Sequence, residues 1–120
     1  MKKIIEVKDL VKSYKDVHAV NGISFDVEEG SLFAFLGENG AGKSTTINVL
    51  CTILKKDSGQ ITINNNDIDK NEDGIRNDIG IVFQNSVLDG MLTVKENLLS
   101  RCSYYGLSNK EKIERISYLV

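Results

Sequence analysis

Nine consecutive residues of this chain have the types and the spacing needed to hold a chain of phosphates. They are Gly37, Glu38, Asn39, Gly40, Ala41, Gly42, Lys43, Ser44 and Thr45, and the first eight match the pattern G-x-x-x-x-G-K-[ST]. In such a loop the backbone N–H groups surround the phosphates, the lysine reaches the outer phosphates and the serine hydroxyl is a ligand for Mg²⁺. The sequence therefore predicts a nucleoside triphosphate site, with Ser44 on the magnesium ion.

The three glycines of this loop suit a backbone that turns tightly around an anion. Because they lack Cβ atoms, they let the amides approach the phosphates closely. A helix that follows would direct its free N-terminal amides and its positive dipole end at the same anion. The alternative is a glycine-rich turn that matches the pattern by chance. An apolar run before the loop and helical spacing after it favour the phosphate site.

The elements on either side of the loop predict an α/β domain. Residues 31–36 are almost continuously apolar, which is typical of a central strand buried on both faces. After the loop, apolar residues recur at helical spacing, which predicts a helix from Lys43 to about Lys55 and Lys56. The loop would then lie between a buried strand and a helix.

Apolar patterning predicts four further strands, at residues 4–8, 23–27, 60–63 and 79–83. The polar stretch 9–21 between the first two is expected to be an extended connection. Only a short turn separates residues 23–27 from the apolar run 31–36. We therefore expect those two strands to pair antiparallel, because a parallel crossover needs more residues.

The remaining elements are expected to be helical. Residues 72–77 predict a short helix, and residues 85–92 a loop. Thr93 and Glu96 have the spacing of a capping box, which predicts a helix that ends near Gly106. Ser108 and Glu111 repeat that spacing and predict a second helix.

Composition is that of an ordinary globular domain. The 120 residues are 41% hydrophobic and 27% charged, with a formal net charge of −2, so nothing suggests an electrostatic nucleic-acid binder. No run approaches a membrane span or a signal-peptide core. Cys51 and Cys102 are the only cysteines and have no metal-binding spacing, which favours two reduced thiols in a cytosolic protein. His18, the only histidine, is interpreted as a solvated loop residue.

Beyond the glycine loop, several segments together resemble the nucleotide-binding domain of ATP-binding cassette (ABC) transporters. They are Tyr14, residues 20–25, the loop 37–45, Gln84 after residues 81–83, and residues 92–98, in the order that the family has them. The resemblance implies a P-loop NTPase core of α/β class with a preceding antiparallel β subdomain. It also implies ATP and Mg²⁺ as cofactors. A P-loop kinase or GTPase is a weaker option.

By this resemblance, Tyr14 is the aromatic residue that stacks on adenine, and an aromatic face can contact any flat base. The alternative is a surface tyrosine on a loop. Gln84 is, by the same resemblance, the glutamine that contacts Mg²⁺ and the attacking water. The loop after it would couple the site to a transmembrane partner. An ordinary polar residue at a strand end is the alternative for Gln84.

Later motifs of the family are not found in the 120 residues. Ser58-Gly59-Gln60 is similar to the end of the family's signature motif, but it lies at a helix-to-strand turn and is rejected. No apolar run ends in Asp followed by Glu, so the Walker-B carboxylate and the catalytic glutamate have no counterpart. We therefore expect residues 1–120 to be the N-terminal part of a single ATPase domain, truncated before those motifs. The helical subdomain would begin at about residue 93.

The resemblance implies an ATP hydrolase that drives transport, with export favoured over import. Its partners would be a transmembrane permease subunit and a second ATPase subunit, with no nucleic acid. The location would be the cytoplasmic face of the membrane, with membrane contact only through the permease. The 120 residues alone are expected to be nearly inactive, with Lys43 and Gln84 contributing to an incomplete catalytic site. The alternative is a soluble, non-transport member of the family that acts on the ribosome or on nucleic acid.

Overall fold

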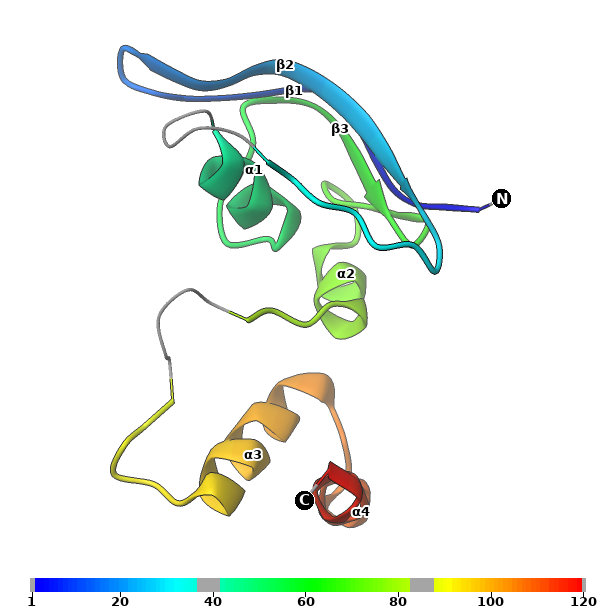
Figure 1. Cartoon of the computed structure of the whole chain (residues 1–120), viewed down its shortest axis with the longest axis vertical. Coiled ribbons are helices and arrows are strands. Elements are labelled where there is room, and N and C mark those ends of the chain that lie inside the picture. The colour runs from blue at the N-terminus through cyan, green and yellow to red at the C-terminus, as the bar shows by residue number, and fades with distance from the viewer. Residues whose placement is uncertain (1, 37–41, 83–87, 120) are drawn as a thin grey trace. The chain divides into compact units, whose positions relative to one another are not determined.

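The structure, a computed structural model, describes residues 2–36, 42–82 and 88–119. The chain divides into two units, Met1–Gly80 and Ile81–Val120. The first unit holds a curved antiparallel sheet and two helices, and the second holds a helical pair (Figure 1). No helix in the described ranges combines the length and the apolar character that a membrane crossing requires.

A long hairpin dominates the first unit. Strand β1 (Lys3–Tyr14) pairs antiparallel with β2 (Val17–Glu28), and several register shifts interrupt the ladder between them. The strands predicted at 4–8 and 23–27 are confirmed, but the extended connection predicted for 9–21 is wrong. Lys15, at φ 50°, helps the chain reverse within two residues, so most of that polar stretch is paired strand.

Two further strands complete the sheet, whose order is β2-β1-β3-β4. Strand β3 (Ser58–Ile63) pairs antiparallel with β1, and the short β4 (Asn66–Asp67) pairs with β3. These confirm the strand predicted at 60–63. The helix predicted at 72–77 is α2 (Glu72–Asp78), and the Asn71 side chain caps its N-terminus.

The core of the first unit lies between the sheet and its two helices. Helix α1 (Lys43–Leu50) lies against the concave side of the hairpin (Figure 1). The buried cluster combines side chains of β1, β2, β3, α1 and α2, which are Val7, Leu10, Val20, Val49, Ile61, Ile63 and Ile75. Each fully buried aliphatic side chain stabilises the fold by roughly 1.5–3 kcal/mol. This packing fixes the position of α1 relative to β2.

The predicted buried strand at 31–36 is not formed. Residues 31–36 have no strand assignment, and Leu32 and Leu36 are 101% and 88% exposed. A strand needs ladder partners, and within the described residues none pairs with 31–36. The predicted pairing of 23–27 with 31–36 is therefore also wrong, and residues 23–27 belong to β2, which pairs with β1. The Phe33 ring instead stacks on Phe25 at 5.6 Å, and the Phe35 ring lies 5.4 Å from Phe25.

Two other boundaries differ from the predictions. Residues 79–82 are not a strand, for the same reason: no strand within the described ranges pairs with them. Helix α1 ends at Leu50 rather than near Lys55, because Thr52 takes the left-handed conformation at φ 63°. The backbone N–H groups of Ile53 and Leu54 both donate to the Asn48 carbonyl and turn the chain toward β3.

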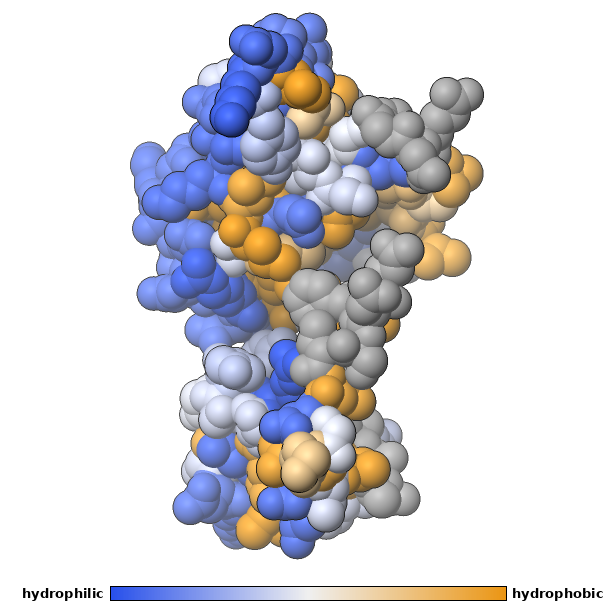
Figure 2. Space-filling model, turned by 90° about the vertical axis from the view of Figure 1, so that its left-hand side faces the viewer, coloured by the Kyte–Doolittle hydropathy of each residue, from blue (hydrophilic) through white to orange (hydrophobic). Residues whose placement is uncertain are grey.

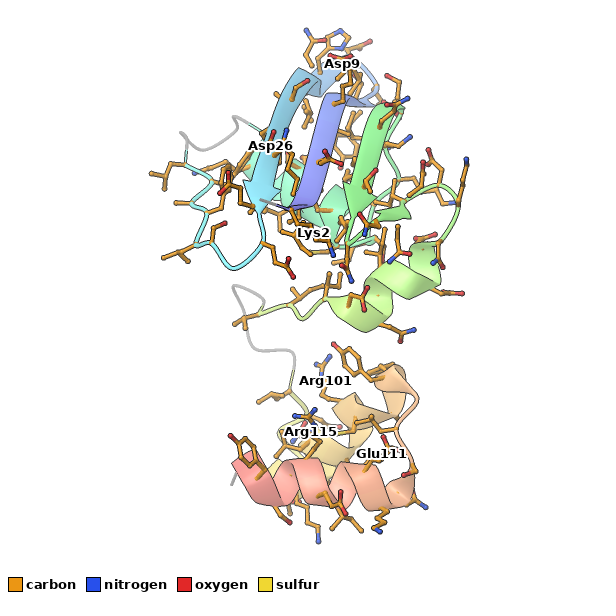
Figure 3. All side chains as sticks on the ribbon, turned by 90° about the vertical axis from the view of Figure 1, so that its right-hand side faces the viewer. Lys2, Asp9, Asp26, Arg101, Glu111 and Arg115 are labelled. Carbon is orange, nitrogen blue, oxygen red and sulfur yellow. The ribbon has the colours of Figure 1, made fainter. Side chains whose placement is uncertain are left out.

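The second unit consists of α3 (Val94–Cys102), a 3-10 turn η1 (Ser103–Tyr105) and α4 (Asn109–Leu119). The capping box predicted for Thr93 and Glu96 is confirmed: the Thr93 hydroxyl accepts from Glu96 N–H, and the Glu96 carboxylate accepts from Thr93 N–H. The Ser108 hydroxyl accepts from Glu111 N–H at 3.2 Å at the start of α4. Arg101 projects from α3, and Glu111 and Arg115 from α4 (Figure 3).

Asn97 of α3 organises the segment that precedes the helix. Its side-chain oxygen accepts from Asp89 N–H at 3.0 Å, and its amide nitrogen donates to the carbonyls of Asp89 and Thr93. Residues 88–92, the described end of the loop predicted for 85–92, are therefore tied to the start of α3. Leu88 and Met91 in this segment are exposed.

Candidate nucleotide site

The structure describes part of the predicted phosphate site. Gly42 to Thr45 and Tyr14 are described, whereas residues 37–41 and Gln84 lie outside the described residues. Lys43 and Thr45 are half-buried and Ser44 is exposed, at the first turn of α1. The residues that close the glycine loop are thus at a helix N-terminus, as the motif requires.

Gly42 is held in a position that only glycine fits. Its φ of 88° and ψ of 8° are left-handed, and it is the N-cap of α1. A Cβ atom on Gly42 would lie 2.3 Å from the Ala19 carbonyl oxygen and 3.2 Å from a methyl group of Val20. The end of the loop therefore docks directly on the backbone of β2. This close approach, together with the positive φ, explains the third glycine of the motif.

The first turn of α1 is electrostatically suited to an anion. No side chain caps the helix at Gly42, and the first turn carries no acidic residue. The Gly42 carbonyl accepts from Thr46 N–H at 2.9 Å, so helical geometry begins immediately after the loop. Because the first turn has neither a side-chain cap nor an acidic residue, no side chain of α1 itself compensates the positive dipole end of the helix. α2, in contrast, has both an Asn71 cap and acidic residues in its first turn.

Tyr14 is the last residue of β1, where it pairs with Val17 of β2. Its side chain is 45% exposed, and the Lys12 ammonium lies 5.5 Å from its ring centroid. Lys12 pairs with Val20, the neighbour of the Ala19 carbonyl that Gly42 approaches. The same end of the hairpin therefore carries Tyr14 and receives the end of the glycine loop.

Asp57 also belongs to this region, although its sequence context did not predict a role for it. Its carboxylate accepts from Ser13 N–H at 2.7 Å and pairs with the Lys12 ammonium at 3.3 Å. The hydrogen bond from Ser13 N–H lowers the pKa of Asp57 most, and the nearby Lys12 ammonium lowers it further. No local pattern signals this contact, because the partners are 44 residues apart in the chain.

Asp69, Asp73 and Asp78 are exposed but have partners. Asp69 pairs with Lys56 at 2.9 Å, and Asp73 with Arg76 at 3.2 Å. The Asp78 carboxylate accepts from the side-chain amides of Asn64 and Asn66. Within residues 2–36, 42–82 and 88–119, no group of three or more His, Cys, Asp or Glu side chains has metal-binding geometry.

Comparison with known proteins identifies the family to which this arrangement belongs. The family described as ABC transporter matches residues 20–119, which is most of the chain. The chain belongs to the ABC transporter family. The match includes the glycine loop, the Gln84 segment and the capping box of α3, so the resemblance noted in the sequence is confirmed.

Individual members of the ABC family show how far the similarity extends. The chain is 39% identical over 119 residues to the Nod factor export ATP-binding protein I of Rhizobium sp. (strain N33), covering 99% of this chain and 39% of that protein. It is similar in structure to cbiO1 from Clostridium perfringens, part of the ABC transporter complex cbiONQ. That match has a TM-score of 0.80 and 34% identity, and covers 98% of this chain and 49% of cbiO1.

A dimeric, post-hydrolysis ATP-binding cassette bound to ADP and phosphate is similar too. Its TM-score is 0.77 with 28% identity, over 92% of this chain and 53% of that cassette. The chain spans 20% to 39% of the length of the curated ABC relatives that it matches. The expected fold class, an α/β ATPase cassette with an antiparallel β subdomain, is confirmed.

Proposed function

We propose that this chain forms the ATP-binding part of the ATPase subunit of an ABC transporter. The observation that carries this proposal is the fit of Gly42 against the Ala19 carbonyl, at a φ that only glycine adopts easily. That fit directs the uncapped N-terminus of α1 to the end of the glycine loop. An anion bound there would meet backbone amides and a positive helix end.

Each site residue has a distinct proposed role. Lys43 neutralises the outer phosphates, the exposed Ser44 hydroxyl is a ligand for Mg²⁺, and the loop residues from Gly37 to Thr45 cradle the phosphates. Tyr14 stacks on the adenine ring, with Gln84 completing the magnesium shell. When bound, Mg²⁺ supplies charge neutralisation between the phosphate oxygens.

Hydrolysis is proposed for the whole protein rather than for residues 1–120. Phosphoryl transfer depends on charge stabilisation and on a group that orients the attacking water. Lys43, the loop amides and Ser44 contribute to the first requirement. The carboxylates of the family's Walker-B segment, which would serve the second, have no counterpart in these residues. We therefore expect residues 1–120 to form one part of a single ATPase domain and to hydrolyse ATP negligibly by themselves.

The partners follow from the same assignment. A second ATPase subunit would close the nucleotide site, and a transmembrane permease would contact the loop after Gln84. The name of the Nod factor export protein supports export as the direction of transport. The proposed location is the cytoplasmic face of the membrane, reached through the permease. Residues from about 93 onward would begin the helical subdomain.

Titration calorimetry of the protein with ATP and Mg²⁺ tests the nucleotide site. Lys43→Ala should weaken ATP binding at least tenfold, because a charge-assisted contact to phosphate contributes about 1.5–3 kcal/mol. Lys55→Ala is the matched control, since Lys55 is an exposed lysine in the segment after α1. Failure of the unmodified protein to bind ATP, or an equal loss in both variants, would refute the proposed site.

A further inference from the structure

Asp57 contacts the end of β1 that carries Tyr14, on the edge of the strand that does not face β2. β1 pairs with β3 only as far as Val11, which faces Ser58, so Lys12 to Tyr14 extend beyond the start of β3. A strand end with one free edge frays unless its backbone groups find other partners. Asp57, the residue immediately before β3, provides those partners.

Asp57 continues the ladder with its main chain and its side chain together. Its backbone N–H donates to the Val11 carbonyl at 2.9 Å, and its carboxylate accepts from Ser13 N–H at 2.7 Å. The carboxylate thus takes the position of the strand carbonyl that is missing beside Ser13. A charged acceptor makes such a bond shorter and stronger than a neutral one.

The segment that carries Asp57 is itself fixed against β1. Gly59 has a φ of 102°, and a Cβ atom there would lie 2.5 Å from the Asp9 carbonyl oxygen. Asp9 lies midway along β1. Because the backbones of residues 57–59 and of β1 are this close, the Asp57 carboxylate has little freedom to move away from Ser13.

Asp57 also acts on the Tyr14 ring through Lys12. The Lys12 side chain is only 15% exposed, lies 3.3 Å from the Asp57 carboxylate and sits over the Tyr14 ring at 5.5 Å. A lysine held at a ring by a carboxylate restricts where the ring can lie. The carboxylate therefore constrains both the backbone just before Tyr14 and one neighbour of its side chain.

We propose that Asp57 is the positioning residue for Tyr14, holding the end of β1 where the ring can stack on the base of a bound purine nucleotide. This inference rests on the proposed function of the site. Asp57 itself touches neither the base nor the phosphates. It lowers the conformational freedom that Tyr14 would otherwise lose on binding, which is the general effect of preorganisation.

The test compares two triphosphate ligands, one with a nucleoside and one without. MgATP can use Tyr14, whereas magnesium tripolyphosphate offers the glycine loop the same phosphates without a base. Asp57→Ala should weaken MgATP binding by about 3–10-fold, a part of what a stacked base contributes, and should leave tripolyphosphate binding unchanged. In a Tyr14→Ala background, Asp57→Ala should have no further effect on MgATP.

Two variants separate positioning from general stability. Asp26→Ala is the matched control, because Asp26 also pairs with a lysine, Lys3, at 2.9 Å and is similarly exposed. It should change neither affinity. Asp57→Asn keeps an oxygen that can accept from Ser13 N–H but loses the charge that attracts Lys12, so its MgATP affinity should fall between those of wild type and Asp57→Ala. Amide hydrogen exchange at Ser13 should accelerate in the alanine variant.

Several results would overturn the positioning role. They are an equal loss of affinity for both ligands, no loss for either, or additive effects of Asp57→Ala and Tyr14→Ala. If Asp57→Ala does not fold, an unchanged MgATP affinity in Asp57→Asn has the same meaning. A wild-type protein that binds tripolyphosphate and ATP with equal affinity refutes the stacking by Tyr14. A wild-type protein that binds neither tripolyphosphate nor ATP refutes the nucleotide site itself. The two ligands thus distinguish failure of the stacking role from failure of the site.

Discussion

The close contact between Gly42 and β2 can be measured by adding a single methyl group. Gly42→Ala places a Cβ 2.3 Å from the Ala19 carbonyl oxygen, where ordinary van der Waals contact begins at about 3.4 Å. Either the glycine loop or β2 must move by roughly an ångström to accommodate it. Gly30 has a similar φ of 74°, but a Cβ there meets nothing within 4 Å. Gly30→Ala therefore isolates the cost of the backbone conformation.

The expected magnitudes follow from these two geometries. A left-handed conformation costs alanine about 1–2 kcal/mol relative to glycine, and this applies to both variants. Reduced freedom of the unfolded chain offsets about 0.4–1 kcal/mol in both. Overpacking against a fixed backbone adds about 1–3 kcal/mol at Gly42 alone. The difference between the two variants should therefore be about 1–3 kcal/mol.

Urea unfolding followed by circular dichroism measures that difference from the two midpoints, provided the slopes agree. Gly42→Ala should also weaken MgATP binding, whereas Gly30→Ala should not, because only the former displaces the start of α1. Equal midpoints for the two variants would refute the close packing of the loop on Ala19. Unchanged MgATP affinity in Gly42→Ala would refute the link between that packing and the nucleotide site.

Three further predictions concern single side chains. The Thr46 hydroxyl is buried and has no hydrogen-bond partner among the described residues. Thr46→Val should therefore raise the free energy of unfolding by about 1 kcal/mol or more, which is seen as a higher urea midpoint. A lower midpoint would show that the hydroxyl has a hydrogen-bond partner. The hydrogen bonds from Thr93 lower the pKa of Glu96 in the folded protein. The ionised Glu96 carboxylate therefore stabilises the folded protein above the ordinary pKa of 4.5, and this stabilisation is lost as the pH falls through the lower, folded value. Helicity measured by circular dichroism should fall over that range, and Glu96→Gln should flatten the response; identical profiles would contradict this. Burial raises the pKa of the Cys51 thiol, so alkylation at pH 8 should be slower than for a free cysteine, with the unfolded protein as the reference; equal rates would show that Cys51 is not shielded.

Exposed apolar side chains mark where local patterns and tertiary structure disagree. In Figure 2 the surface of the first unit shows orange apolar areas beside blue polar ones. Leu32, Leu36 and Val82 are exposed, although the runs that contain them have the composition of buried strands. Composition predicts that such residues favour burial, but a strand also needs neighbouring strands to pair with, and these lie elsewhere in a chain.

The residues of the candidate site also differ in how far they could be predicted from the sequence. The glycine loop is contiguous, so its motif could be recognised from nine neighbouring residues. Tyr14 and Gln84 needed the order of several motifs, which only the resemblance to the ABC family provided. Asp57 could not be found by either route, because its role depends on Ser13 and Lys12, which reach it only when β3 lies beside β1.

The features that could be predicted from the sequence depend on residues within about four positions of one another. The capping box of α3, the stop at Gly106 and the phosphate-binding motif are of this kind, because their partners are supplied by the local backbone. Three other features depend on the tertiary structure: which strands pair, the hairpin formed by the polar stretch after Lys8, and the contact of Gly42 with Ala19. These contacts join residues far apart in the chain, and their formation depends on how the whole sheet packs around its core.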